Sequence, residues 1–444
     1  MANLNIELNK FTGTEIRRLN GGNLGPQFSH YLPELEREFA ELEIPLIRLH
    51  DAPWMNPGMR LVDIQHIFGN FKADAQDPDN YYFAQTDEYI RKILEAGSKV
   101  MYRLGTSIEH SRPKFFVFPP PDFEKWTDIC INIIRHYNEG WNNGFHWNIQ
   151  YWEIWNEPDG GKHCAPNPSL MWNGTAEQFC DLYEAASTRI KARFPKIKIG
   201  AASFRKLNDD PQFMQKFYER CRDKKLPLDF FSWHRYSGPN DPFGIINEPS
   251  QARKTLEAYG FKNTELHLAE WRYMHDWGDS DYATVRAAVH AAATLCAWQD
   301  TSLDMGEFYT IGCNIFDAKC WGCWNLKGKS NIYHAFKAFA ELAHFPKRVS
   351  CASDTENFRI LAGRDAGNGF AALITDYMTP DESIFLNIGN ADLESIEVFL
   401  LDSDTKMGKI IPEISGRTIV LKTPKDNASL YLLTGKYKFT PEIK

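Results

Sequence analysis

From about residue 15 to residue 345 the chain alternates short apolar runs with longer amphipathic stretches. Eight runs have the length and hydrophobicity of buried strands: 18–23, 45–50, 99–104, 150–155, 197–201, 229–236, 265–270 and 307–312. Between them apolar residues recur at helical spacing, notably over 32–42, 86–96, 122–137, 176–194, 212–222, 281–299 and 331–343. Thr86 and Asn331 have the character of helix starts, and Gly97 that of a helix stop. Eight strand–helix units predict an α/β fold, a (β/α)8 TIM barrel rather than an open doubly wound sheet.

The pattern changes after Pro346. Short β-type runs follow one another, separated by Gly, Asn and Asp turns, at 357–362, 369–375, 383–387, 395–401, 418–421 and 428–433. They predict a C-terminal β-sandwich over residues 346–444, after a barrel over residues 12–345. A further run at 5–11 resembles a lone edge strand, so residues 1–11 can join the sandwich.

Charge and motif content argue against several classes of partner. The chain has 50 basic and 58 acidic residues, a net charge of −8, and no basic run with interleaved aromatic residues. This balance is unfavourable for a nucleic acid partner, and no strand is followed by a GxGxxG or GxxxxGK motif for nucleotides. No stretch approaches a membrane span, and the first ten residues lack the pattern of a secretory signal. We therefore expect no membrane partner and a cytoplasmic protein, or a secreted or periplasmic one whose signal peptide is absent from this sequence. The oligomeric state cannot be predicted.

Nine cysteines are an odd number in a chain too large to need disulfides, so reduced thiols are expected. Cys313, Cys320 and Cys323 form a C-x6-C-x2-C cluster. A zinc site would need a fourth ligand at a matching spacing, and none is evident. We expect buried or loop thiols here and no metal.

Polar residues gather where the predicted strands end, and in a barrel the C-terminal ends of the strands line the site. These residues are His50, Asp51, Arg103, Asn156, Glu157, His234, Tyr236 and Glu270. So many groups of this kind after apolar strands would be unusual at random strand ends. They therefore predict a binding or catalytic site at this end of the barrel.

Two of these residues are carboxylic acids on the fourth and seventh predicted strands, which places them across the barrel mouth from each other. Glu157 follows the apolar and aromatic run 151–155, so its pKa should be raised. Glu270 follows the run 266–269. A facing pair of this kind is what a retaining glycosidase uses, one as the nucleophile and the other as the acid and then the base. Either glutamate by itself could instead be a salt-bridged residue of the barrel.

The same residues resemble a known family. Trp155-Asn156-Glu157-Pro158 on the fourth strand, Ser232-Trp233-His234-Arg235-Tyr236 on the sixth and Glu270 on the seventh resemble glycoside hydrolase clan A. Within that clan the chain is most similar to family 39, which includes β-xylosidases and α-L-iduronidases. The resemblance covers the barrel and the trailing β region. It implies a retaining hydrolase that acts on a glycosidic bond of an oligosaccharide or glycoside, without a cofactor.

The resemblance also implies roles for individual residues. Glu157 matches the acid/base and Glu270 the nucleophile of the family. Asn156 matches the residue that binds the sugar 2-hydroxyl, and Tyr236 the residue that orients the nucleophile and lowers its pKa. Double displacement then requires that the pKa of Glu157 be raised and that of Glu270 lowered.

Other candidates for substrate binding keep a structural alternative. His50 and His234 match ligands of the sugar in the −1 subsite, but could be strand-end residues bonded to backbone. Trp321 and Trp324, after the last barrel strand, could stack on a sugar or pack within their loop. Lys162 and His163 could bind an anionic or branched sugar, although a solvated loop is the simpler interpretation.

Two features leave the reaction and its substrate open. The loop 51–54 reads Asp-Ala-Pro-Trp, unlike the His-Gly-rich turn of the family's xylosidases, so the sugar cannot be transferred from the resemblance. A transglycosylase would use the same site, with an acceptor sugar in place of water. A non-catalytic sugar-binding protein is a further alternative, although it would not need both carboxylates.

Overall fold

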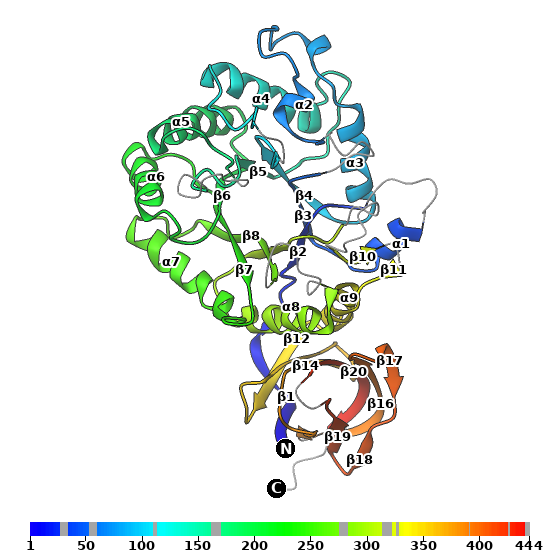
Figure 1. Cartoon of the computed structure of the whole chain (residues 1–444). Coiled ribbons are helices and arrows are strands. Elements are labelled where there is room, and N and C mark those ends of the chain that lie inside the picture. The colour runs from blue at the N-terminus through cyan, green and yellow to red at the C-terminus, as the bar shows by residue number, and fades with distance from the viewer. Residues whose placement is uncertain are drawn as a thin grey trace.

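The structure is a computed structural model that describes residues 1–26, 34–52, 60–109, 113–160, 170–274, 283–312, 322–325, 328–389, 391–424 and 427–439. A barrel surrounded by helices forms the larger part, and a curved sheet lies beside it (Figure 1). The N-terminus lies at the sheet.

Eight parallel strands close the barrel in chain order, β2-β3-β4-β5-β6-β7-β8-β9. Their bounds are Asn20–Asn23, Leu46–Leu49, Lys99–Leu104, Tyr151–Ile154, Lys198–Phe204, Phe230–Ser237, Glu265–Tyr273 and Met305–Phe308. The predicted barrel is confirmed: each strand overlaps its predicted run, although β9 shares only residues 307–308 with the run expected at 307–312. The strands are buried along most of their length because helices cover their outer faces, which explains why they are almost continuously apolar.

The helices alternate with these strands. They are α1 Glu34–Ala40, α2 Ile64–Ile67, α3 Ala84–Glu95, α4 Phe123–Glu139, α5 Ala176–Arg193, α6 Pro211–Lys224, α7 Glu248–Ala258, α8 Val285–Ala297 and α9 Asn331–Ala343. Short 3-10 turns occur at Pro78–Asn80, Gly244–Ile246 and Trp298–Asp300, and a two-stranded ribbon pairs β10 Trp324–Asn325 with β11 Gly328–Lys329.

Local signals account for most helix ends. Thr175 and Gln178 form a reciprocal capping box at the start of α5. Gly97 has a φ of +88° after α3, as its predicted role as a stop requires. The predicted start at Thr86 was wrong, because α3 begins at Ala84 and Thr86 is buried within its first turn. The expected helices did not include α2 or α7.

A ten-stranded sheet forms the second domain, in the order β17-β16-β20-β14-β13-β12-β1-β15-β19-β18. Its strands are β1 Ala2–Glu15, β12 Lys347–Ser353, β13 Phe358–Arg364, β14 Gly369–Tyr377, β15 Ser383–Gly389, β16 Ala391–Leu401, β17 Lys406–Ile410, β18 Glu413–Ser415, β19 Thr418–Lys422 and β20 Ala428–Phe439. The sheet curves around its own core, to which alternate residues such as Leu4, Ile6, Ile384 and Leu386 contribute. β12, β17 and β18 were not expected from the sequence.

The N-terminal strand differs from the sequence prediction. β1 is not an edge strand: it lies between β12, to which it is antiparallel, and β15, to which it is parallel. Leu4, Ile6 and Leu8 are fully buried, because every second residue of β1 points into the core of the sheet. The first fifteen residues therefore join two strands that are distant in the sequence.

Helix α8 packs between the two domains. It lies between the barrel and strands β13, β14 and β20 of the sheet (Figure 1). Seven of its residues from Ala287 to Ala293 are buried, and five of these are alanines, whose small side chains let a strand approach closely. Helices in the described part of the chain all lack the length and apolarity of a membrane span.

Candidate active site

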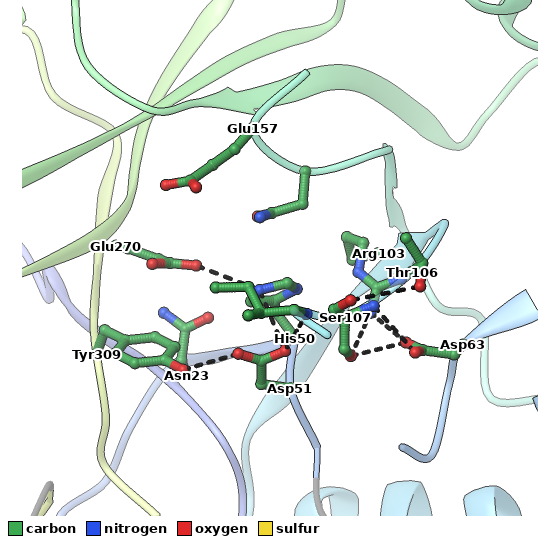
Figure 2. A network of polar contacts seen from close by, with 12 residues as sticks. Asn23, His50, Asp51, Asp63, Arg103, Thr106, Ser107, Glu157, Glu270 and Tyr309 are labelled. Atoms are coloured by element: carbon green, nitrogen blue, oxygen red, sulfur yellow. Dashed lines mark hydrogen bonds and ion pairs between the residues drawn. The ribbon is translucent and has the colours of Figure 1, made fainter. Parts of the chain in front are cut away.

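Glu157 and Glu270 meet at the C-terminal mouth of the barrel. One carboxylate oxygen of each lies within 4.8 Å of the other, and both lie within 4.8 Å of a nitrogen of His234. Glu157 follows β5, whereas Glu270 and His234 pair in register on the adjacent strands β8 and β7. A register shift between Trp233 and His234 opposes two residues of β8 to one of β7, and such a bulge re-aims the side chains that follow it. Figure 2 shows the two carboxylates close together, with His50 beside Glu270.

The backbone around Glu157 is held in an uncommon conformation. Trp155 and Glu157 have φ values of +72° and +45°, in the left-handed region that costs a non-glycine residue of order 1–3 kcal/mol. The Glu157 amide donates to the carbonyls of Ala202 and Ser203, at 3.1 and 3.0 Å, so neighbouring strand β6 maintains this turn. Burial raises the pKa of the Glu157 carboxyl to about 7, against the attraction of Arg205 and Arg48. The expected rise is therefore present, and Glu157 is substantially protonated near neutral pH.

Glu270 has more hydrogen-bond donors around it than Glu157. The Tyr236 hydroxyl donates to Oε2 at 2.6 Å, and Arg48 Nη1 donates to Oε1 at 3.0 Å. The predicted lowering of the Glu270 pKa was nevertheless wrong: burial raises it. The loss of hydration and the neighbouring Glu157 outweigh the favourable contacts with Arg48 and Tyr236.

Arg48, on β3, is the central cation beneath the two carboxylates. Besides Glu270, its guanidinium donates to Glu153 Oε2 at 2.7 Å, Asn156 Oδ1 at 2.6 Å and Asn23 Oδ1 at 3.2 Å. Arg48 and Glu153 are both fully buried. Burial opposes the charge on Glu153, but Arg48 and two serine hydroxyls hold the pKa of this carboxyl below its usual value. One buried ion pair thus orients groups from several strands.

Several buried polar atoms at the mouth have no hydrogen-bond partner among the described residues. They are both ring nitrogens of His50, Nδ2 of Asn156 and Nε2 of His234. Arg48 fixes the Asn156 amide by its oxygen, so its NH2 group remains available as a donor. Burial lowers the pKa of His234 to about 4, and that of His50 well below its usual value, so both rings are neutral. Unpaired buried polar groups are costly, and groups rich in hydroxyls would satisfy them.

Comparison with known proteins agrees with this geometry. Residues 35–301, more than half of the chain, match the model of glycosyl hydrolases family 39. The chain belongs to this family.

Two β-xylosidases are similar to this chain in sequence. The enzyme of Geobacillus stearothermophilus is 27% identical over 319 residues, which are 64% of this chain and 60% of that protein. The enzyme of Caldicellulosiruptor saccharolyticus is 25% identical over 208 residues, or 44% and 37% of the two chains. The chain thus spans about three fifths of one relative and less than two fifths of the other.

Solved structures share the whole fold. A glucosidase from Croceicoccus marinus superposes with a TM-score of 0.78 at 22% identity, over 98% of this chain and 99% of the other. A β-xylosidase from Caulobacter crescentus gives 0.70 at 15% identity, over 98% and 100%. At these identities the likeness concerns the fold of barrel and sheet.

Within this family 39 chain, the two histidines and Tyr236 lie where the sequence predicted. His234 Nδ1 is 2.8 Å from Glu157 Oε1 and 3.5 Å from Glu270 Oε2. His50 Nε2 is 3.7 Å from Glu270 Oε1. Neither ring has a backbone partner in the described residues, so the structural alternative for these histidines finds no support there.

Trp324, by contrast, packs within the protein, which was the alternative to stacking on a sugar. Its side chain is 5% exposed, its indole nitrogen donates to Glu38 Oε2 at 2.7 Å, and its ring packs against Phe39 and Tyr333. It fills the space between α1 and α9, where it is buried against protein and not free to stack on a sugar. Trp321, the other predicted stacking residue, lies outside the described residues.

Other loop residues singled out in the sequence also lie outside the described residues: Lys162, His163, Cys313 and Cys320. Cys323 is described, and its side chain is fully buried.

One group of described residues has the spacing of a cation site. It is Glu157, His234 and Glu270, with one potential ligand atom each. The Arg48 guanidinium already occupies a lone pair of Glu270, and its charge opposes a metal ion at this position. The arrangement is better suited to proton transfer and nucleophilic attack than to metal binding.

The buried residues that support the two carboxylates, Arg48 and Glu153, were not predicted from the sequence. Arg48 and Glu153 stand inside apolar strands, and a charged residue within a buried strand is uncommon unless it is paired. A charged residue inside an apolar strand was therefore the feature of the sequence that could have identified Arg48 and Glu153. The hydroxyls of Ser203 and Ser232, each 2.7 Å from Glu153 Oε1, carried no comparable signal.

Proposed function

We propose that this protein is a retaining glycoside hydrolase that works by double displacement, with Glu270 as nucleophile and Glu157 as acid/base. The observation that carries the proposal is the pair of buried carboxylates whose oxygens approach within 4.8 Å. Retaining enzymes place their two carboxyl groups about 5 Å apart, whereas inverting enzymes leave several more ångströms for a water molecule.

The environments of the two residues support the division of roles. Glu270 accepts hydrogen bonds from Arg48 and Tyr236, which favour its ionised form, whereas the described contact of Glu157 is with neutral His234. Of this coupled pair, Glu270 is therefore the group that gives up its proton first. Glu157, with its pKa raised to about 7, keeps its proton as a general acid must.

In the first step, a Glu270 oxygen forms a bond to the anomeric carbon as the bond to the leaving oxygen breaks. Glu157 gives its proton to that oxygen. In the second step, Glu157 takes a proton from water, the water oxygen bonds to the anomeric carbon, and the carboxylate of Glu270 departs. Asn156 Nδ2 is placed to bind the 2-hydroxyl, and His50 and His234 to bind other hydroxyls of the same sugar. The carbohydrate substrate is a neutral glycoside of the type that β-xylosidases and glucosidases cleave.

The nucleophile role is tested with Glu270→Ala. Turnover of an aryl glycoside, found by screening xylosides, glucosides and arabinofuranosides, should fall at least about 10⁴-fold, since nucleophile deletions have effects of this size. Azide should restore part of the rate and yield a glycosyl azide of inverted configuration. Glu265→Ala is the matched control, because Glu265 begins the same strand at the other end of the barrel. Full activity of Glu270→Ala would end the proposal.

The acid role and the stereochemistry have separate tests. Glu157→Gln should spare glycosides whose leaving group needs no proton, such as a dinitrophenolate, and impair those with a sugar leaving group. Equal loss on both kinds of substrate would count against the acid role. NMR of the first product formed should show the anomer of the substrate, and an inverted product would refute retention.

A further inference from the structure

Asp51 presents a carboxylate at the mouth that the proposed mechanism does not use. It follows His50 at the end of β3 and has a φ of +52°. Its Oδ1 accepts from the Ile108 amide at 3.0 Å, and its Oδ2 accepts from the Tyr309 hydroxyl at 3.0 Å. Ile108 follows β4 and Tyr309 follows β9, so loops on either side of β3 hold the carboxylate in place (Figure 2).

This carboxylate is held in place, but its hydrogen bonds to the described residues leave part of its capacity as an acceptor unused. Each carboxylate oxygen has two lone pairs, and each Asp51 oxygen uses one of them in the hydrogen bonds described above. The side chain is 14% exposed, so it remains open towards the mouth. A hydroxyl group could donate to either oxygen without displacing Ile108 or Tyr309.

His50 lies beside Asp51 with complementary capacity. Its Nε2 is 3.5 Å from Asp51 Oδ1 and 3.7 Å from Glu270 Oε1, and neither ring nitrogen has a hydrogen-bond partner among the described residues. A neutral imidazole offers one N–H donor and one acceptor. A hydroxyl between the two residues could therefore accept from His50 and donate to Asp51.

The position of Asp51 indicates which part of a sugar it would meet. In Figure 2, Glu157 and Asp51 lie at opposite ends of the site, with Glu270 and His50 between them. If Glu157 protonates the leaving oxygen and Glu270 attacks the anomeric carbon, the ring extends towards His50 and Asp51. Its edge farthest from the scissile bond, which carries the 3- and 4-hydroxyls, then faces this pair.

We propose that Asp51, together with His50, is a specificity-determining pair that binds a hydroxyl on the edge of the sugar remote from the scissile bond. The inference rests on the proposed function. The hydroxyl donates a charge-assisted hydrogen bond to an Asp51 carboxylate oxygen, and His50 Nε2 or Nδ1 donates a hydrogen bond to the same hydroxyl. A sugar without a hydroxyl at this position leaves both residues unsatisfied and is rejected.

The test compares the wild type with Asp51→Asn on three substrates. These are the aryl glycoside that the wild type hydrolyses fastest, its 3-deoxy analogue and its 4-deoxy analogue. On the parent glycoside, Asp51→Asn should lower kcat/KM by about tenfold to a hundredfold, as expected for a hydrogen bond to a charged group. On the analogue that lacks the contacting hydroxyl, wild type and variant should agree within about threefold, because removal of either partner breaks the same contact.

Two further variants sharpen the comparison. Asp402→Asn is the matched control: Asp402 is also half-buried and accepts from backbone amides, at Asp404 and Thr405, but lies in the sheet domain. Asp402→Asn should leave kcat/KM unchanged on all three substrates. Tyr309→Phe keeps the Asp51 carboxylate but removes one of the two hydrogen bonds that hold it, so it should show a weaker loss that the same deoxy analogue abolishes. If Asp51→Asn does not fold, Tyr309→Phe tests the inference in its place.

The outcomes separate this inference from the proposed function. Equal losses on all three substrates would mean that Asp51 only holds the loops after β4 and β9, and an unchanged parent rate would mean that it binds nothing; either result overturns the inference. If the wild type cleaves no glycoside at all, the proposed function fails first. If the wild type is active and Glu270→Ala behaves as proposed, only the role of Asp51 is at stake.

Discussion

The two ends of the barrel both contain buried charged groups, but they use them differently. At the mouth, two buried carboxylates face each other, the pKa of each is raised, and several donors have no partner among the described residues. At the floor, opposite charges meet: His267 Nδ1 lies 2.7 Å from Glu307 Oε1, and Lys198 contacts Glu265. There the pKa of His267 is raised and that of Glu265 is lowered, as ion pairing predicts.

The pKa shifts at the floor show whether burial or charge pairing has the larger effect. Burial alone would lower the pKa of His267, but Glu307 and Glu265 raise it to about 9. Burial would raise the pKa of Glu265, but His267 and Lys198 lower it to about 2. Charge pairing therefore outweighs loss of hydration at the floor, whereas loss of hydration is the larger effect on Glu157 and Glu270. We infer that ion pairing stabilises the charged forms of His267 and Glu265 at the floor, whereas ionisation of Glu157 and Glu270 at the mouth carries an energetic cost.

Arg48→Met should produce the largest effect. It leaves Glu153 buried without its countercharge and removes the guanidinium from Glu270 and Asn156, so the free energy of unfolding should fall by about 3–5 kcal/mol. Lys198→Met at the floor should cost less than about 1 kcal/mol, since both Lys198 and its partner are partly exposed. Urea unfolding measures both, and equal costs would contradict the expectation that breaking the fully buried pair at Arg48 costs more than breaking the partly exposed pair at Lys198.

Two tyrosines offer a comparison in rate. Tyr236 donates to Glu270 at the mouth, and Tyr151 donates to Glu265 at the floor, at 2.6 and 3.0 Å. Tyr236→Phe should lower kcat about 10²- to 10³-fold, the usual effect of deleting one preorganised donor at a reacting group. Tyr151→Phe should leave kcat within about threefold of the wild type. Steady-state kinetics with one aryl glycoside would decide, and a large effect of Tyr151→Phe would contradict the assignment of the floor to stability.

The charge on His267 should make the floor sensitive to alkaline pH. Its pKa is raised from 6.5 to about 9 by folding, so its contribution is complete below about pH 6.5 and is lost as pH rises through 9. The free energy of unfolding should decline over this interval by up to about 3 kcal/mol. His267→Phe should flatten this part of the profile, and an unaltered slope in the variant would show that another group titrates.

At the mouth it is the neutral form of Glu157 that the fold favours, whereas at the floor it is the charged form of His267. Because folding raises the pKa of Glu157 to about 7, the folded state binds the proton more tightly, and stability falls as pH rises from about 4.5 to 7. Glu157→Gln should therefore raise the free energy of unfolding at pH 8 by about 2 kcal/mol while removing the proposed general acid. In the wild type, kcat/KM should fall about tenfold per pH unit above 7. A variant less stable than the wild type at pH 8 would show that the Glu157 environment is not strained by its charge.

The sequence predicted the barrel well because its signals are local. Apolar runs of strand length, helical periodicity and residues such as Gly97 act within one element, and eight such units have few ways to pack. The curved sheet was predicted less completely. β1 occupies an interior position between β12 and β15, more than 330 residues away, and no local pattern encodes a pairing over that distance.

Within the site, the sequence alone predicted which groups meet: polar strand ends placed Glu157, Glu270, His234 and Tyr236 at one mouth. Only the tertiary structure decided how these groups are tuned. It brought Arg48 to Glu153 and Glu270, buried Trp324 between helices, and raised the pKa of Glu270 where the sequence had predicted a fall. The reason is physical, because the order of residues fixes which groups end a strand, whereas hydration, charge pairing and hydrogen bonding depend on what the rest of the fold places around them.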